Sequence, residues 1–75
     1  MHADSFTNII NKVLKPNFEK LLHDTTGKVK VELKKEVHKE MKKIPLLPAF
    51  EKKRIEKRID YYIDHPQALK KLLGL

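Results

Sequence analysis

The chain has 75 residues, of which 40% are hydrophobic and 36% are charged, a balance that is typical of a folded protein rather than a disordered one. This length allows a single domain with a thin core, and the lack of cysteine excludes disulfide bonds and thiolate metal sites. Seventeen Lys and Arg residues against ten Asp and Glu residues give a formal net charge of +7, which favours a polyanionic partner.

The N-terminal part of the chain begins with an amphipathic helical pattern, which Ser5 is expected to cap. Its apolar side chains recur at helical spacing: Phe6, Ile9, Ile10, Val13 and Leu14. Pro16 interrupts the pattern, because proline lacks the amide donor and disfavours helix at the preceding residue. The sequence therefore predicts either one kinked helix or a helix followed by a shorter one that ends near Leu22.

Residues 28–43 follow a turn at 24–27, where Thr25 or Thr26 is expected to cap the next helix. Apolar residues at successive four-residue steps predict that helix: Val29, Leu33, Val37 and Met41. The opening residues of the segment also alternate as a strand would. A single strand would have no partner in so helical a chain, so we predict a helix.

Residues 44–48 contain two prolines and are expected to form a connection, with Pro48 in the first turn of the following helix. That helix, 49–63, has its apolar residues on one face: Ile55, Ile59, Tyr62 and Ile63. The next residues again contain a proline and predict a break.

A short last helix is expected after Asp64 or His65, one of which caps it, with Pro66 in the first turn and Gly74 at the C-cap. The predicted fold is all-α, a small bundle of four to five short helices. The chain, 1–75, is expected to form one small helical domain, either as a whole protein or as a module of a larger chain.

The positive charge is concentrated in one part of the sequence. Residues 28–58 contain twelve basic residues and five Glu, and so carry the entire excess, whereas 1–27 and 59–75 are each neutral. A local excess of this kind attracts nucleic acid, an anionic membrane surface or an acidic protein.

On both central helices the basic side chains lie opposite the apolar stripe. We predict a nucleic-acid-binding surface that comprises Lys28, Lys35, Lys39, Lys42, Lys53, Arg54, Lys57, Arg58 and Tyr61. Because fifteen of the seventeen basic residues are Lys, the expected contacts are to the phosphate backbone of DNA or RNA, with weak base selectivity. Tyr61 is suited to stack on a base. The alternative is a solvated basic face in which Tyr61 packs against another helix.

Catalytic and metal-binding patterns are missing from the sequence. The four histidines, His2, His23, His38 and His65, fall in different segments without metal-ligand spacing, and no Ser or Thr has the context of a nucleophile. We therefore expect a binding protein without cofactor or metal, and not an enzyme. With no apolar stretch near the roughly 20 residues of a membrane span and no secretory signal, an intracellular location is expected.

Leucines give a second hypothesis. Leu46 and Leu47 either cover the core or contact a partner, and Leu69, Leu72 and Leu75 either close the bundle or form a homodimer seam. The alternative function is thus a protein–protein interaction or assembly module whose basic face meets an acidic partner. Membrane attachment is the weakest hypothesis, because the apolar face of 49–63 is needed by the core.

Overall fold

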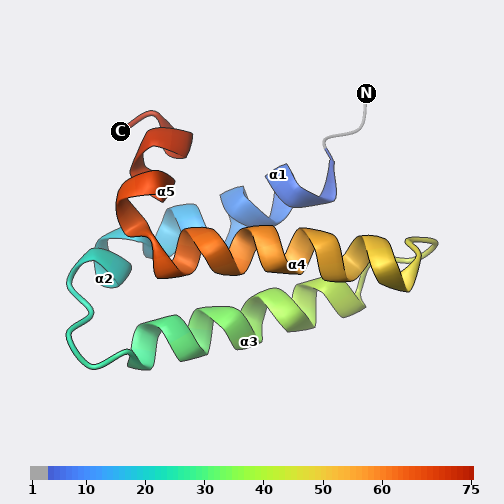
Figure 1. Ribbon diagram of the computed structural model, residues 1–75, viewed down its shortest axis with the longest axis horizontal. Helices are drawn as coiled ribbons and strands as arrows, with labels where there is room; N and C mark the ends of the chain where they lie inside the picture. Colours follow the sequence, from blue (N-terminus) through green and yellow to red (C-terminus); the bar gives the residue numbers. More distant parts are fainter. Residues whose placement is uncertain (1–3) are drawn as a thin grey trace.

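The computed structural model describes residues 4–75, and helices are its only regular structure within that range (Figure 1). In chain order the elements are α1 (Ser5–Ile9), a π-helical turn (Ile10–Leu14), a 3-10 turn (Lys15–Asn17), α2 (Phe18–Leu22), α3 (Lys28–Lys42), α4 (Ala49–Asp64) and α5 (Pro66–Leu73). The prediction of a small all-α bundle is confirmed, and 28–42 is helical rather than extended.

The first helical segment continues through Pro16 by changing its winding, instead of breaking there. Proline removes one amide donor and its ring crowds the carbonyl one turn back, which a regular α-helix does not accommodate. The wider π-helical turn before Pro16 and the tighter 3-10 turn around it make room for the ring. The side-chain amide of Asn17 donates to the Val13 carbonyl at 2.7 Å, which satisfies an acceptor within this irregular stretch.

The N-terminal caps differ from those predicted. Asp4, not Ser5, caps α1, because its carboxylate accepts a hydrogen bond from the Thr7 amide at 2.7 Å. Pro48 precedes α4 as its cap residue and adopts an extended conformation, so it is not in the first turn. His65 occupies the cap position of α5, and Gly74 ends that helix with φ +74, as predicted.

The start of α3 is organised by Asp24, which lies several residues before the helix. One carboxylate oxygen accepts from the amides of Gly27 at 2.9 Å and Thr26 at 3.3 Å, and the other accepts from the Lys30 amide at 3.3 Å. Gly27 is the cap residue itself and has φ +82, a conformation that favours glycine. Thr26 adds only a long hydrogen bond from the Lys28 amide, at 3.4 Å, so the expected Thr cap is a minor contribution.

α3 and α4 are antiparallel and form a hairpin that runs the length of the molecule, while α1 to α2 cover it and α5 folds back at one end (Figure 1). The buried core is entirely apolar and draws on each part of the chain: Ile9, Ile10, Val13, Leu14, Phe18, Leu21, Leu33, Val37, Met41, Ile59, Ile63 and Leu69. The opposite faces of α3 and α4 are therefore free to carry charge.

Substitution of Ile59 by Ala should lower the free energy of unfolding by about 2–4 kcal/mol, because a fully buried side chain is replaced by a cavity. Urea denaturation followed by circular dichroism measures this loss. Val31→Ala on α3 is the control: Val31 is 53% exposed, so its loss should stay within about 0.5 kcal/mol. Equal effects of the two substitutions would contradict the assigned helix faces.

Asp24→Ala should destabilise the protein at pH 7. Burial alone would raise the pKa of Asp24, but hydrogen bonds from the amides of Lys30, Gly27 and Thr26 outweigh it and hold the pKa below its ordinary value of 3.8. The stabilisation is therefore present above pH 3.8 and is lost as the pH falls through the lower folded-state pKa. In thermal unfolding, the gap between variant and parent should narrow in acid. Thr25→Ala should unfold like the parent at every pH.

Candidate nucleic-acid interface

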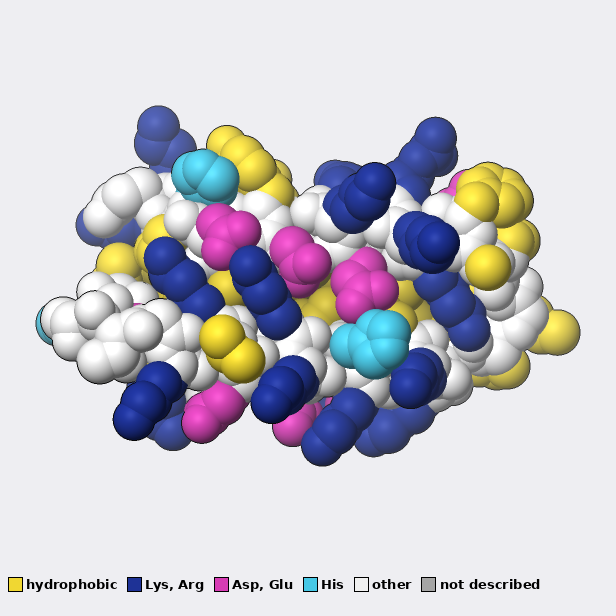
Figure 2. All heavy atoms as spheres, turned by 60° about the horizontal axis from the view of Figure 1, so that its bottom comes forward, with side chains coloured by type: hydrophobic (Ala, Val, Ile, Leu, Met, Phe, Trp, Pro, Cys, Tyr) yellow, Lys and Arg dark blue, Asp and Glu magenta, His cyan; other side chains and the backbone are white. Residues whose placement is uncertain are grey.

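All nine side chains of the predicted binding surface are exposed. They do not form one continuous face: a row of acidic side chains follows the junction of α3 and α4, and basic side chains lie on both sides of it (Figure 2). The surface therefore consists of two basic ridges, which we call the α3 ridge and the α4 ridge.

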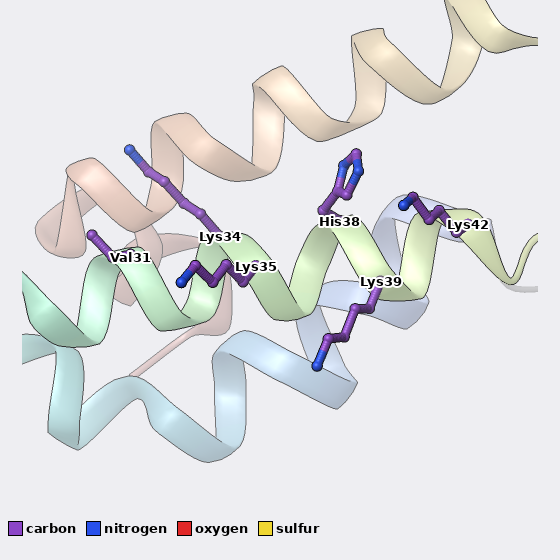
Figure 3. Close-up of a pocket in the computed structure, with 6 residues that line it drawn as sticks. All are labelled: Val31, Lys34, Lys35, His38, Lys39 and Lys42. Carbon is purple, nitrogen blue, oxygen red and sulfur yellow. The ribbon is translucent and has the colours of Figure 1, made fainter.

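The α3 ridge carries Lys28, Lys35, Lys39 and Lys42, as predicted from the helical periodicity. A hollow of about 500 Å³ runs along it, lined by Val31, Lys34, Lys35, His38, Lys39 and Lys42 (Figure 3). Because all the lining residues belong to α3, this hollow is an open surface groove and not a cavity between elements. Lys34 and His38 point toward α4 in Figure 3, whereas Lys39 points away from it. The groove thus combines lysine stems with the exposed Val31 side chain.

The α4 ridge carries the other predicted residues, Lys53, Arg54, Lys57, Arg58 and Tyr61. Its two arginines contact neighbouring side chains. The Arg58 guanidinium lies 4.1 Å from the centre of the Phe6 ring, an intramolecular cation–π contact. Arg54 lies 3.8 Å from the Glu51 carboxylate, a long and exposed ion pair of little energetic weight. Lys53 and Lys57 have no ion-pair partner within the described residues. The unengaged charge of this ridge is therefore on its two lysines.

Tyr61 is 52% exposed but is already stacked on one side. Its ring lies 4.2 Å from the His65 ring, with 24° between the planes, and it meets Tyr62 edge-on at 5.5 Å. The imidazole Nδ1 of His65 lies 2.8 Å from the Tyr61 carbonyl oxygen, which holds the imidazole in place. One ring face of Tyr61 is thus covered by His65, and the side chain remains 52% exposed.

The junction between the ridges, here called the seam, comprises Lys34 and His38 of α3 and Glu56, Asp60 and Asp64 of α4. Lys34 Nζ lies 3.0 Å from Asp64 Oδ1, and His38 Nδ1 lies 2.9 Å from Glu56 Oε1. Glu56, Asp60 and Asp64 are four residues apart and so lie on one flank of α4, and the packing of α3 places this flank against a second basic helix. Asp64, expected as a possible cap, is instead a partner of Lys34.

Asp60 lies between these two ion pairs and is the least satisfied group of the seam. Its Oδ1 atom is buried and has no hydrogen-bond partner in the part of the chain that the structure describes. Burial raises the pKa of Asp60; the nearby Lys34 ammonium opposes this, and the carboxylates of Glu56 and Asp64 add to it. The ionised form of Asp60 is therefore unfavourable in the folded protein.

A second ion-pair group ties the N-terminal segment to α3. Lys12 lies 3.0 Å from Glu40, and Lys43 lies 3.6 Å from the same carboxylate oxygen. Side-chain hydrogen bonding to Lys12 lowers the pKa of Glu40 against the effect of burial. Glu36, Glu40, Glu51, Glu56 and Asp64 are thus in ion pairs, whereas the lysines without an ion pair within the described residues include Lys28, Lys35, Lys42, Lys53 and Lys57.

The leucines singled out by the sequence have different surroundings. Leu69 is fully buried, so it has no surface to offer to a partner, and Leu47 packs against the core. Leu72 and Leu75 are 44% and 62% exposed, and Leu46 is entirely exposed. The last three are the leucines available for docking.

The described histidines are dispersed: His38 is in the seam, His65 stacks on Tyr61, and His23 lies 3.9 Å from Glu19. His2 lies outside the described residues. Within residues 4–75, no three His, Asp or Glu side chains are grouped so as to hold a metal ion, and no helix is long and apolar enough to cross a bilayer.

Comparisons with protein-family models, with curated proteins and with solved structures give no match for this chain. The geometry and charge of the two ridges are therefore the features that indicate a function.

Asp60→Asn should raise the stability of the protein at pH 7, because it removes a partly buried charge with an unpaired oxygen. With a raised folded-state pKa, Asp60 lowers stability as the pH rises above its ordinary value of 3.8. The variant's advantage in thermal unfolding should therefore be present at pH 7 and disappear in acid. Glu32→Gln, at an exposed position of α3, is the control and should have no effect. A less stable Asn variant would mean that Asp60 has a net favourable interaction with Lys34.

Proposed function

We propose that this protein is a small nucleic-acid-binding module that contacts the phosphate backbone through the α3 and α4 ridges. The observation that supports this function best is a set of exposed lysines on two neighbouring helices that have no carboxylate partner among residues 4–75: Lys28, Lys35, Lys42, Lys53 and Lys57. A lysine in this state contributes its full charge to a passing polyanion, whereas a paired lysine must first lose its partner.

The mechanism is neutralisation of phosphates with release of the counterions that surround the nucleic acid. Lysine presents a compact hydrated charge rather than the bidentate fork of arginine, so binding is expected to depend weakly on base sequence. The acidic seam repels phosphates, and a bound backbone should therefore follow one ridge, or two strands should lie on either side of the seam.

Replacing Lys53 and Lys57 together by Gln should weaken binding to duplex DNA or single-stranded RNA at least about tenfold, equivalent to roughly 1.4 kcal/mol. The plot of log affinity against log salt should also become less steep by about two, because two phosphate contacts are lost. Gln is preferred to Glu because it places no new carboxylate beside Glu56 and Asp60. Fluorescence anisotropy at several salt concentrations measures both effects.

The matched control replaces Lys15 and Lys20 by Gln, which removes the same charge from exposed positions in the covering segment. The control should retain most of the affinity. Equal losses in the two double variants would reduce the interaction to attraction by net charge alone. No binding of the parent to either nucleic acid at low salt would contradict the proposed function and favour an acidic protein partner.

A further inference from the structure

The connection between α3 and α4 presents one leucine in an unusual state. Leu46 is 101% exposed, and it is the only residue other than glycine with a positive φ, +65, among residues 4–75. The left-handed conformation is unfavourable for a residue with a Cβ, which comes close to the following carbonyl oxygen. Because it is fully exposed, the Leu46 side chain gains no packing against residues 4–75 that would offset this strain. Strained conformations that persist without local benefit are concentrated at functional sites.

The residues on both sides of Leu46 are held in place. α3 ends with hydrogen bonds from the Lys43 amide to the Glu40 carbonyl at 3.2 Å and from the Ile44 amide to the Met41 carbonyl at 3.3 Å. Ile44 and Leu47 both pack against the core. Two prolines, Pro45 and Pro48, further restrict the backbone of the connection. Leu46 therefore projects from a connection, here called the tip, whose neighbouring residues are fixed by hydrogen bonds and core packing.

Basic residues flank this connection in the sequence. Lys42 in the last turn of α3 and Lys53 near the start of α4 are exposed and have no ion-pair partner within the described part of the chain. Phe50, 67% exposed, adds a second apolar group. The only carboxylate in the first turn of α4, Glu51, lies beside Arg54. At the right-hand end of Figure 2, which carries this connection, hydrophobic side chains project next to basic ones.

We infer that Leu46 is a wedge that inserts between neighbouring base pairs of a bound duplex, with Lys42 and Lys53 holding the flanking phosphates. This inference rests on the proposed function and specifies how the site engages DNA. Apolar side chains that enter a base step cover the base faces that unstacking exposes, and they kink the duplex by about 20–90°. A membrane contact is less favoured, because an interfacial surface requires a broad apolar face rather than one projecting leucine and one phenylalanine.

The test compares the parent with Leu46→Gly on a duplex of about 20–30 base pairs that carries a fluorophore at each end and 2-aminopurine within it. The parent should shorten the end-to-end distance and increase the 2-aminopurine emission. The Gly variant should lose both signals and bind about tenfold more weakly, while the salt dependence stays unchanged because the lysines remain. Its thermal midpoint should be equal or higher, because glycine accepts a positive φ. Leu46→Met, which retains an apolar wedge, should retain both signals.

The outcomes separate this inference from the proposed function. Salt-dependent binding of the parent without bending or unstacking would overturn the wedge and leave the backbone-binding function in place. Absence of binding to duplex at low salt would overturn the wedge, and absence of binding to single-stranded RNA as well would overturn both. Unimpaired signals from Leu46→Gly would also overturn the wedge. The wedge would also be overturned if the protein did not bind duplex but bound vesicles of phosphatidylserine and phosphatidylcholine in a way that depends on Leu46. That result would assign Leu46 to a membrane contact.

Discussion

The packing of two strongly basic helices against each other is the constraint on which this structure depends. Leu33 and Val37 of α3 belong to the same buried core as Ile59 and Ile63 of α4. If only these apolar contacts held the two helices together, their like charges would face each other along the junction. The carboxylates of α4 at helical spacing in the seam face that flank of α3 and remove the repulsion. Exposed ion pairs contribute little energy individually. Their main effect here is to favour the side-by-side arrangement and leave the remaining positive charge on the outer ridges.

Helical periodicity predicted the elements of the fold. The apolar stripe of 49–63 mixes odd and even positions, which a helix but not a strand brings to one face. For 28–43, where the start also alternates as a strand would, the lack of a partner strand decided for a helix. The buried residues Val37, Ile59 and Ile63 follow directly from the helical periodicity. The helix starts were harder to predict. Asp24 bonds an amide six positions later, at Lys30, and so escapes patterns based on the residue next to the helix. The conformation around Pro16 could not be predicted either, because it depends on a π-helical and a 3-10 turn, which the spacing of apolar residues does not reveal.

For the candidate site, the sequence predicted which side chains are exposed but not how they are arranged. Summing charge along segments treated 59–75 as neutral and separate from the basic part. In the fold, Asp60 and Asp64 from that segment lie in the seam, where they divide one expected surface into two ridges. Similarly, a helical wheel places Tyr61 among basic residues and gives no sign of the His65 ring that covers one of its faces. Both differences arise because the flank of a helix acquires neighbours only through tertiary packing.

Two unfavourable features, the unpaired oxygen of Asp60 and the positive φ of Leu46, occur in the same hairpin. A chain of this size with a thin core has little stability in reserve, so features that weaken folding without a local gain need another explanation. The proposed complex with nucleic acid would explain both features. An ionised Asp60 repels phosphates from the seam and keeps a bound backbone on the ridges. Lys42 and Lys53 lie on the turns of α3 and α4 next to the connection, so a backbone held on these lysines would pass close to Leu46.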